Sequence, residues 1–265
     1  MAYKNMYMNT QEKDELDRLY RQANISWTKE LKTLKNLGVK DGHRILEVGS
    51  GPGFVTELLF KGFNDIKVTS IDIDGNLINV AKERLGNSYE GRLEFVETYV
   101  EETPFEDNTF DIAICRLVFQ HLSKPMDAAK EIHRVLKPGG KIIILDVDNG
   151  MWGTTYPENN FLNMLNEGVG SFQGKTGGDR QVGRKLLKIL KKSEFEEVDF
   201  EIIPTHSDIV GKEYFKSRLK MPTMSKRMNM MQKQVYNMMK SCENFFDDEE
   251  TCIILLMIVA IGTKK

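Results

Sequence analysis

The sequence predicts an α/β fold, in which a doubly wound and mostly parallel sheet of seven strands is covered by helices on both faces. Between His43 and Asp146, short apolar runs typical of buried strands alternate with segments whose apolar residues recur at helical spacing. A glycine-rich turn also joins the first apolar run to the first amphipathic segment. Alternation of this kind requires right-handed crossovers, and the ligand then binds beyond the carboxyl ends of the strands.

Each element is expected from its own local pattern. Apolar runs of strand length predict strands over 43–48, 66–72, 92–97, 110–115, 140–146, 197–204 and 251–263. Amphipathic segments predict helices over 54–61, 75–86, 125–136 and 181–192. Leucines at helical spacing among charged residues predict one or two further helices over 12–37, ahead of the sheet.

Two regions depart from the alternation. Residues 147–180 are rich in glycine and aromatic side chains, which favours a long loop over a cleft at the strand ends. In residues 212–246, methionines recur at intervals of three or four and predict a helix with one apolar stripe. That stripe packs in the core or in a homodimer, or it lines an adaptable pocket.

The composition narrows the class of protein. The 265 residues carry a net charge of −2, so no global field favours nucleic acid or an anionic membrane. The three cysteines are far apart and form no metal or redox motif, which is typical of a reduced, cytoplasmic setting. The longest apolar stretch, Cys252–Ile261, is about half of the ~20 residues that a membrane-spanning helix needs. These observations favour an enzyme that acts on small molecules and needs no metal.

The most informative stretch is Ile45–Phe54, which predicts a buried strand, a turn with three glycines and the start of a helix. Its spacing is E-x-G-x-G-x-G, whereas a dinucleotide site requires G-x-G-x-x-G with a helix N-terminus directed at a pyrophosphate. Phe54 stands at the place of the third glycine of that motif, and Glu47 adds a charge that repels a pyrophosphate. The loop therefore favours a cationic ligand without phosphate.

This stretch resembles the glycine-rich signature of the class I S-adenosylmethionine-dependent methyltransferases. Three further segments resemble signatures of the same family in the same order: the second strand with its acidic tip, the turn before the fourth strand and the turn before the fifth, at 68–74, 104–111 and 135–141. The resemblance is closest over residues 40–150. It implies a Rossmann-like domain with S-adenosyl-L-methionine as its cofactor.

On this resemblance, residues 1–265 form a single methyltransferase domain with four kinds of segment. Residues 39–150 are the cofactor-binding core, and 251–263 are the final strand. Residues 151–180 and 205–250 are inserts on the substrate side. Residues 1–38 form a helical lid over the cofactor, or a helix pair that merely packs on the domain.

The resemblance also implies the residues that hold the cofactor. Glu47 and the glycine-loop backbone would surround its amino-acid end and sugar, and Asp72 would accept hydrogen bonds from both ribose hydroxyls. Asp74 is expected to cap the following helix instead. Tyr99 stands where many relatives carry an acidic residue, so its ring or hydroxyl, or the Val100 N–H, would meet adenine. The full expected set is Glu47, Gly49, Ser50, Gly51, Gly53, Asp72, Ile73, Tyr99, Val100, Arg116 and Leu117, with the last two beside the methionine moiety.

The acceptor side is expected to hold a proton acceptor and several substrate contacts. His121 is the expected base, since an imidazole with a pKa of about 6.5 takes a proton near neutrality. The alternative is a histidine that only holds a backbone group behind the strand tip. Trp152, Tyr156 and Arg180 are expected to face the substrate. Arg180 shares a helix face with Arg184, and the two either bind a substrate carboxylate or tie a lid to the domain.

The predicted function is direct methyl transfer from S-adenosyl-L-methionine to an oxygen, nitrogen or carbon of a small molecule, releasing S-adenosylhomocysteine. Enclosure by two inserts favours a small acceptor, and the sequence shows no basic surface with interleaved aromatic residues for nucleic acid. Two alternatives remain open. One is a methyltransferase of proteins or RNA, and the other is a cofactor-binding protein without transferase activity.

Overall fold

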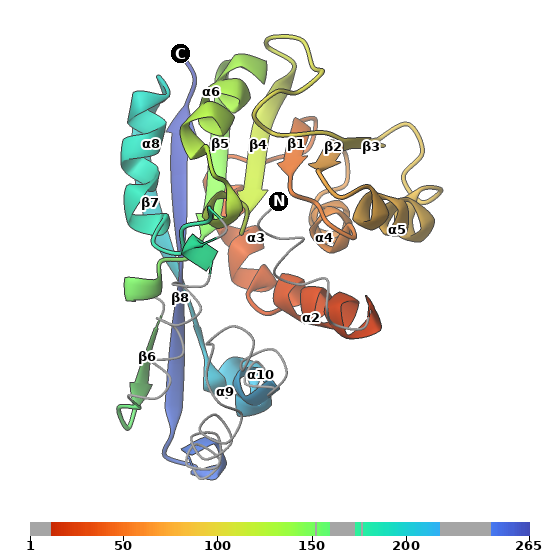
Figure 1. Ribbon diagram of the computed structural model, residues 1–265. Helices are drawn as coiled ribbons and strands as arrows, with labels where there is room; N and C mark the ends of the chain where they lie inside the picture. Colours follow the sequence, from red (N-terminus) through yellow and green to blue (C-terminus); the bar gives the residue numbers. More distant parts are fainter. Residues whose placement is uncertain (1–11, 152, 160–172, 176, 218–244) are drawn as a thin grey trace.

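The computed structural model describes residues 12–151, 153–159, 173–175, 177–217 and 245–265. Its strands form one sheet that stands between two layers of helices, and the two amino-terminal helices lie near the carboxyl ends of the central strands (Figure 1). The α/β, mostly parallel fold expected from the sequence is confirmed.

The first part of the sheet is parallel. Its strands follow in the order β3 (Leu93–Glu97), β2 (Lys67–Asp72), β1 (Arg44–Val48), β4 (Phe110–Arg116) and β5 (Leu136–Asp146). The long strand β8 (Cys252–Thr263) then runs antiparallel to β5 on one edge and to β7 (Glu196–His206) on the other. The strand order reverses between β1 and β4, and this is the place where open α/β sheets bind their ligands.

The described residues form a sheet of eight strands, where the sequence predicted seven. The additional strand is β6 (Gly153–Tyr156), which pairs with Cys252–Leu255 of β8 beyond the end of β5. Four residues in a glycine-rich region give too short an apolar pattern to predict a strand. The pairing is instead created by the length of β8, which extends past β5 and offers a free edge.

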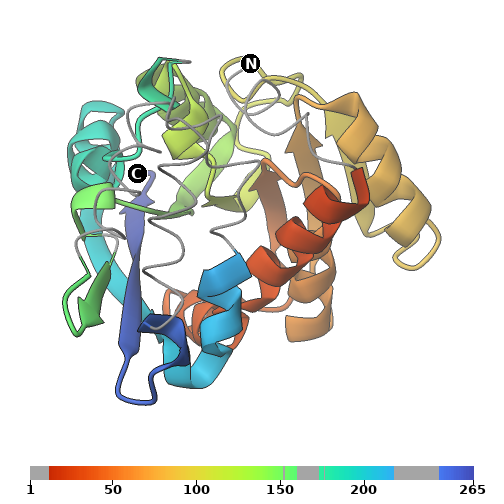
Figure 2. The ribbon, with the colours of Figure 1, turned by 60° about the horizontal axis from the view of Figure 1, so that its bottom comes forward.

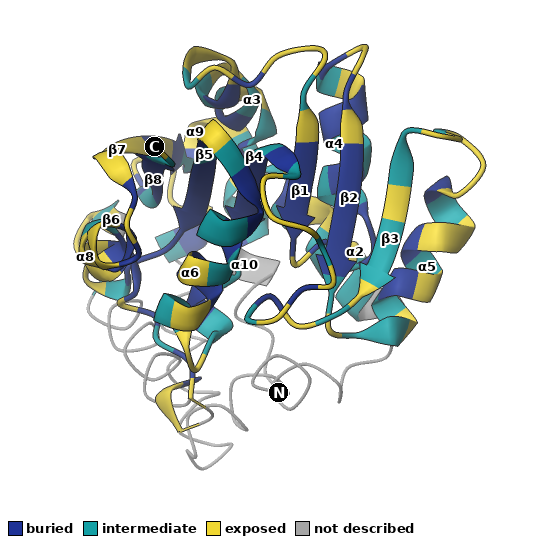
Figure 3. Ribbon diagram, turned by 90° about the horizontal axis from the view of Figure 1, so that it is seen from above, coloured by how far each residue is buried: buried dark blue, intermediate teal, exposed yellow. Residues whose placement is uncertain are grey.

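Two apolar clusters cover the two faces of the sheet, and its central strands are largely buried (Figure 3). Side chains alternate along each strand with a period of two, so Leu46 and Val48 join one cluster and Ile45 joins the other. The helices α3 (Trp27–Asn36) and α4 (Phe54–Gly62) pack on the side of Ile45. The opposite side is covered by α6 (Pro125–Val135) and α8 (Leu186–Lys192), while α5 (Gly75–Leu85) packs against β2 and β3.

One helix begins later than expected. The sequence predicted a helix over 181–192, but α8 begins at Leu186 after a short 3₁₀ turn, η3 (Gly183–Lys185). A Cβ atom on Gly183 would lie 2.7 Å from Ile258 Cδ1 and 3.0 Å from the carbonyl oxygen of Val147, so this residue packs directly against the sheet. The close approach fixes the path of the chain before the regular helix begins.

The amino-terminal helices lie at the carboxyl ends of the parallel strands (Figure 1). Helix α2 (Glu12–Asn24) crosses the carboxyl ends of the central strands, and α10 (Lys212–Ser217) lies beside it (Figure 2). The short helix α9 (Ser207–Val210) joins β7 to α10. The methionine stripe expected within 212–246 falls mostly outside the described residues. Within the described ranges, no helix is both long and apolar enough to cross a membrane.

Candidate cofactor and acceptor site

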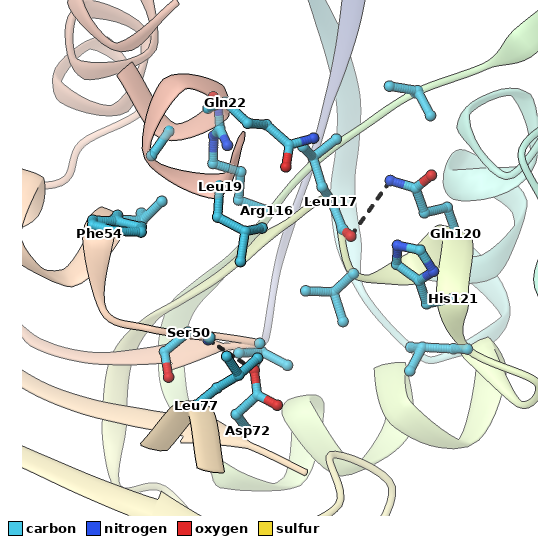
Figure 4. Close-up of a pocket in the computed structure, with 18 of the residues that line it drawn as sticks. Leu19, Gln22, Ser50, Phe54, Asp72, Leu77, Arg116, Leu117, Gln120 and His121 are labelled. Carbon is cyan, nitrogen blue, oxygen red and sulfur yellow. Dashed lines mark hydrogen bonds between the residues drawn. The ribbon is translucent and has the colours of Figure 1, made fainter. Parts of the chain in front are cut away.

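A cavity of about 690 Å³ lies at the carboxyl ends of the central strands (Figure 4). Its floor is formed by the glycine loop and the tips of β2 and β4, and α2 closes it from one side. The α2 side contributes Arg18, Leu19, Gln22, Ala23, Ile25 and Ser26. A further wall comes from β7, β8 and α10, with Ile203, Thr205, Leu255, Leu256, Met257 and Tyr214. None of these residues was individually predicted from the sequence to line the site, although residues 1–38 were expected to form a lid or a packed helix pair and 205–250 an insert on the substrate side.

The glycine loop brings its backbone to the cavity. Gly49 has φ +72°, and a Cβ atom there would lie 2.4 Å from Val118 Cγ2, so no other residue fits without displacing this neighbour. Gly51 has φ +52° and also lines the cavity. Between them, Ser50 has a buried hydroxyl without a hydrogen-bond partner among the described residues, and it borders the same cavity. The loop therefore presents an unsatisfied polar group to a ligand.

Asp72 stands at the tip of β2 and lines the cavity. Its carboxylate accepts hydrogen bonds from the backbone N–H groups of Gly51 and Asp74, at 2.8 Å and 2.9 Å. Burial raises the pKa of Asp72 above its usual range. Asp74 caps α5, because its side chain accepts the N–H of Asn76 at 3.0 Å, as the sequence predicted. Asp72 is thus held in place by the loop that it faces.

Glu47 and Gly53 were expected at the cofactor, but neither lines the cavity. The alternation along β1 turns Glu47 toward α4, where its carboxyl accepts the hydroxyls of Thr56 at 2.5 Å and Ser70 at 2.7 Å. Burial raises the pKa of Glu47 to about 7. A Cβ atom on Gly53 would lie 3.1 Å from the Ala81 side chain, so this glycine lets α4 approach α5. Both residues support the loop from behind.

Arg116 lines the cavity, but its guanidinium is held by the amino-terminal helices. Its Nε and Nη2 donate to the carboxylate of Glu30 at 2.6 Å and 2.8 Å, and Nη2 also donates to the carbonyl oxygen of Gln22 at 2.8 Å. Ser26 donates its hydroxyl to the same carboxylate. The ion pair is buried, and it fastens α2 and α3 to the tip of β4. Leu117 follows at φ +59° and borders the cavity beside it (Figure 4).

The expected adenine side is more open. Val100 is buried and lines the cavity, whereas Tyr99 at its rim is 60% exposed. Ile73 is also partly exposed at the same rim. A ring at the rim can lie against a flat ligand face, while the interior position offers only a small apolar side chain and a backbone N–H.

His121 lines the cavity from η1 (Phe119–His121), the 3₁₀ turn that follows β4. The side-chain amide of Gln173 lies 3.2 Å from Nδ1 of His121 and donates to the carbonyl oxygen of Gln120 at 2.6 Å. Burial, together with the positive charges of Arg180 and Arg18, lowers the pKa of His121 to about 3. The imidazole is therefore neutral at physiological pH and is a weak base.

Of the two described residues expected at the substrate, only Arg180 reaches the cavity. Arg180 lines the cavity and is buried, whereas Tyr156 lies on β6 with 66% of its surface exposed and does not reach it. Trp152 lies outside the described residues. Arg184, the neighbour of Arg180 in the sequence, is drawn away by Asp148, which accepts both Nε and Nη2 of Arg184 at 2.7 Å and 2.5 Å. Among the described residues, no cluster of three metal-ligating side chains occurs.

Residues 46–144 match a family model described as a methyltransferase domain. The matched range contains the glycine loop, Asp72 and the whole tip of β4. Over this range the resemblance to the class I S-adenosylmethionine-dependent methyltransferases is confirmed.

Similarity to individual methyltransferases is moderate. A ubiquinone/menaquinone biosynthesis C-methyltransferase, UbiE, of Pseudomonas fluorescens is 32% identical over 116 residues, which are 43% of this chain and 45% of that protein. The UbiE protein of Azotobacter vinelandii is 29% identical over 137 residues, 50% of this chain and 54% of the relative. The chain thus spans about half the length of the curated relatives that it matches.

Solved methyltransferases share the fold over almost the whole chain. An S-adenosylmethionine-dependent methyltransferase of Thermotoga maritima superposes with a TM-score of 0.59 at 19% identity, covering 96% of both chains. A phosphoethanolamine N-methyltransferase of Haemonchus contortus, solved with S-adenosyl-L-methionine, gives a TM-score of 0.56 at 22% identity, covering 90% of this chain and 52% of that one. At these identities the likeness establishes the fold.

The family model matches only part of the residues that line the cavity. The floor lies within residues 46–144, whereas α2, Arg180 and the β7–β8 wall lie outside this range. The family model therefore matches the floor of the cavity and not these other walls.

Proposed function

We propose that this methyltransferase transfers the methyl group of S-adenosyl-L-methionine to a small-molecule acceptor and releases S-adenosylhomocysteine. One observation carries the proposal: a single cavity joins the glycine loop and Asp72 to a wall formed by β7, β8 and the segment before α8. Its volume of about 690 Å³ lies in the range of small-molecule sites. Cofactor and acceptor would therefore meet in one cavity.

The residues at the floor fit the cofactor. The orphaned hydroxyl of Ser50 and the glycine backbone would receive its amino-acid end, and the Asp72 carboxylate would accept its ribose hydroxyls. Tyr99, Ile73 and the Val100 N–H would border adenine. Leu117 would lie beside the methionine moiety, where Arg116 contributes mainly by holding α2 in place.

The protein itself has to orient the acceptor and to exclude water from the cavity. When bound, the cofactor supplies a methyl group already activated by its sulfonium charge. The chain's own residues would align the acceptor in line with that methyl group, and α2 would keep water out. A small acceptor suits this arrangement, because a protein or RNA would require an open face where α2 lies.

A quinol-type carbon acceptor is a second, narrower candidate. The matching curated relatives are named as C-methyltransferases of ubiquinone and menaquinone biosynthesis. Their matched segments cover about half of each relative. Quinol-type molecules are therefore the first acceptors to assay.

Calorimetric titration with S-adenosyl-L-methionine, S-adenosylhomocysteine and NADH tests the cofactor assignment. We expect micromolar binding of the first two and none of NADH. Transfer of a radiolabelled methyl group is then measured in fractionated cell extract. Label in the small-molecule fraction supports the proposal, and label only in protein or RNA contradicts it. Binding without any transfer would indicate a cofactor-binding protein instead.

His121 is expected to be dispensable as a base. A neutral imidazole with a pKa of about 3 accepts a proton poorly, so His121→Gln should lower the transfer rate by less than about tenfold, against 10²–10⁴ for loss of a general base. Initial rates across neutral pH measure this, with His206→Gln as a control outside the cavity. A hundredfold loss with unchanged cofactor affinity would restore His121 as the base.

A further inference from the structure

The side of the cavity opposite Ser50 and Asp72 carries a polar wall (Figure 4). Gln120 and His121 of η1 form part of it, and Gln173 and Arg180 pack around them. Gln173 and Arg180 lie outside the range of the family match, whereas Gln120 and His121 lie within it. The kind of ligand that this wall can bind is therefore inferred from the contacts of its four residues.

Arg180 places a buried positive charge at this wall. The residue is only 8% exposed and lines the cavity. Its Nε donates to Asn149 Oδ1 at 2.9 Å, and its Nη1 donates to Gln173 Oε1 at 3.4 Å. The nearby carboxyl of Asp146 accepts the backbone N–H groups of Gln120 and Val147, and burial raises its pKa to about 7. Its negative charge is therefore only partly present near neutrality.

Gln120 adds a hydrogen-bond acceptor, its side-chain oxygen, to which no described residue donates. The residue is 3% exposed, and its Oε1 atom is buried without a hydrogen-bond partner among the described residues. Its Nε2 donates to the Leu117 carbonyl oxygen at 3.4 Å, which fixes the orientation of the amide (Figure 4). A buried acceptor left unpaired costs about 1–3 kcal/mol, so a ligand that donates a hydrogen bond here would be favoured.

An apolar surface faces the same space. Ile203 of β7 and Leu255 and Met257 of β8 line the cavity, and their side chains offer no hydrogen bond. A ligand that fills this part of the cavity gains by burying an apolar body of its own.

We propose that Arg180 and Gln120 form the acceptor subsite, and that it takes a small amphipathic molecule with an anionic oxygen on Arg180, a donor toward Gln120 and an apolar body against β7 and β8. This inference rests on the proposed function, because it names the acceptor class of the same cavity. A phenol, an enol or a carboxylic acid meets the description.

The subsite also accounts for activation of the acceptor without a base. The guanidinium stabilises the ionised form, so a phenol or enol releases its proton to solvent on binding. The acceptor's electron pair then forms a bond to the methyl carbon as the carbon–sulfur bond breaks, and its electrons return to sulfur. Transfer at carbon is completed by loss of the ring or α-carbon proton to solvent.

Matched probes test the subsite by calorimetry on the full chain saturated with S-adenosylhomocysteine. We expect benzoate to bind at least about tenfold more tightly than its neutral counterpart benzamide. Arg180→Gln should abolish this preference. Arg184→Gln is the matched control, because Arg184 pairs with Asp148 outside the cavity, and it should retain the preference.

A second probe distinguishes phenolates from carboxylates. The phenol and phenolate forms of 4-nitrophenol absorb at different wavelengths, so its pKa is read directly in the presence of the protein. A fall of about one unit that is lost in Arg180→Gln indicates a phenol or enol acceptor, since one unit corresponds to a tenfold preference for the ion. Benzoate preference without this fall indicates a carboxylate acceptor.

Failure of this inference is separable from failure of the proposed function. The titration with S-adenosylhomocysteine comes first, and its failure would contradict the cofactor assignment. If S-adenosylhomocysteine binds but neither probe favours the anion, or if Arg180→Gln and Arg184→Gln behave alike, the acceptor subsite is wrong.

Discussion

Replacement of Glu30 by alanine is expected to lower the free energy of unfolding by about 3–5 kcal/mol. Glu30 is buried and accepts two hydrogen bonds from Arg116, at 2.6 Å and 2.8 Å. Its removal leaves the Arg116 guanidinium buried with only the Gln22 carbonyl oxygen, among its described contacts, to receive it. Urea unfolding of the purified variant measures the loss.

Two further variants separate the ion pair from general damage. Lys61→Ala breaks the exposed pair between Lys61 and Glu57, and it should cost less than about 1 kcal/mol. The double variant Glu30→Leu with Arg116→Met removes both buried charges and should recover much of the stability. A loss for Glu30→Ala no larger than that for Lys61→Ala would show that the pair does not fasten the helices.

Asp72→Ala is expected to weaken binding of S-adenosyl-L-methionine by at least about 100-fold. A carboxylate that accepts two hydrogen bonds contributes about 1.5–3 kcal/mol for each, and every 1.4 kcal/mol is tenfold in affinity. The same change releases the Gly51 N–H, which Asp72 holds at 2.8 Å, and so loosens the glycine loop. Isothermal calorimetry measures the affinity.

Asp74→Ala provides the matched control. Asp74 lies two residues further along and also borders the cavity, but its carboxylate caps α5 through the Asn76 N–H. This variant should lose about 1 kcal/mol of stability and keep its cofactor affinity within a few fold. Equal affinity for wild type and Asp72→Ala would remove Asp72 from the cofactor site.

The helices and strands could be predicted from the sequence, because the residues that determine them lie close together in the chain. The run Ile45–Val48 and the glycines after it predicted β1 and the loop, and the structure places them within one residue of the expected bounds. Asp74 as a helix cap followed from its position directly before the helix expected at residue 75, again a local relation. Strand β6 was missed because its pairing comes from the overhang of β8 and from no pattern of its own.

The lining of the cavity was harder to predict, because it depends on which face of a strand or helix turns toward the cavity. Glu47 and Ile45 alternate with Leu46 and Val48, so the sequence held the signal that Glu47 faces away from Leu46. Only the packing of α4 decided that this face is buried against Thr56 instead of opening on the cavity. The same holds for Arg180 and Arg184. Arg180 lines the cavity, whereas Arg184 forms an ion pair with Asp148 outside it.

The sequence by itself determined the parallel sheet, the glycine turn, the acidic tip of β2 and the family. These features depend on side-chain periodicity and on backbone preferences within a few residues of each other. The tertiary structure alone decided that Glu30 meets Arg116, that α2 closes the cavity and that Arg180 and Gln120 share one wall. Such contacts join residues far apart in the chain, and they exist only after the sheet and its two layers of helices have packed together.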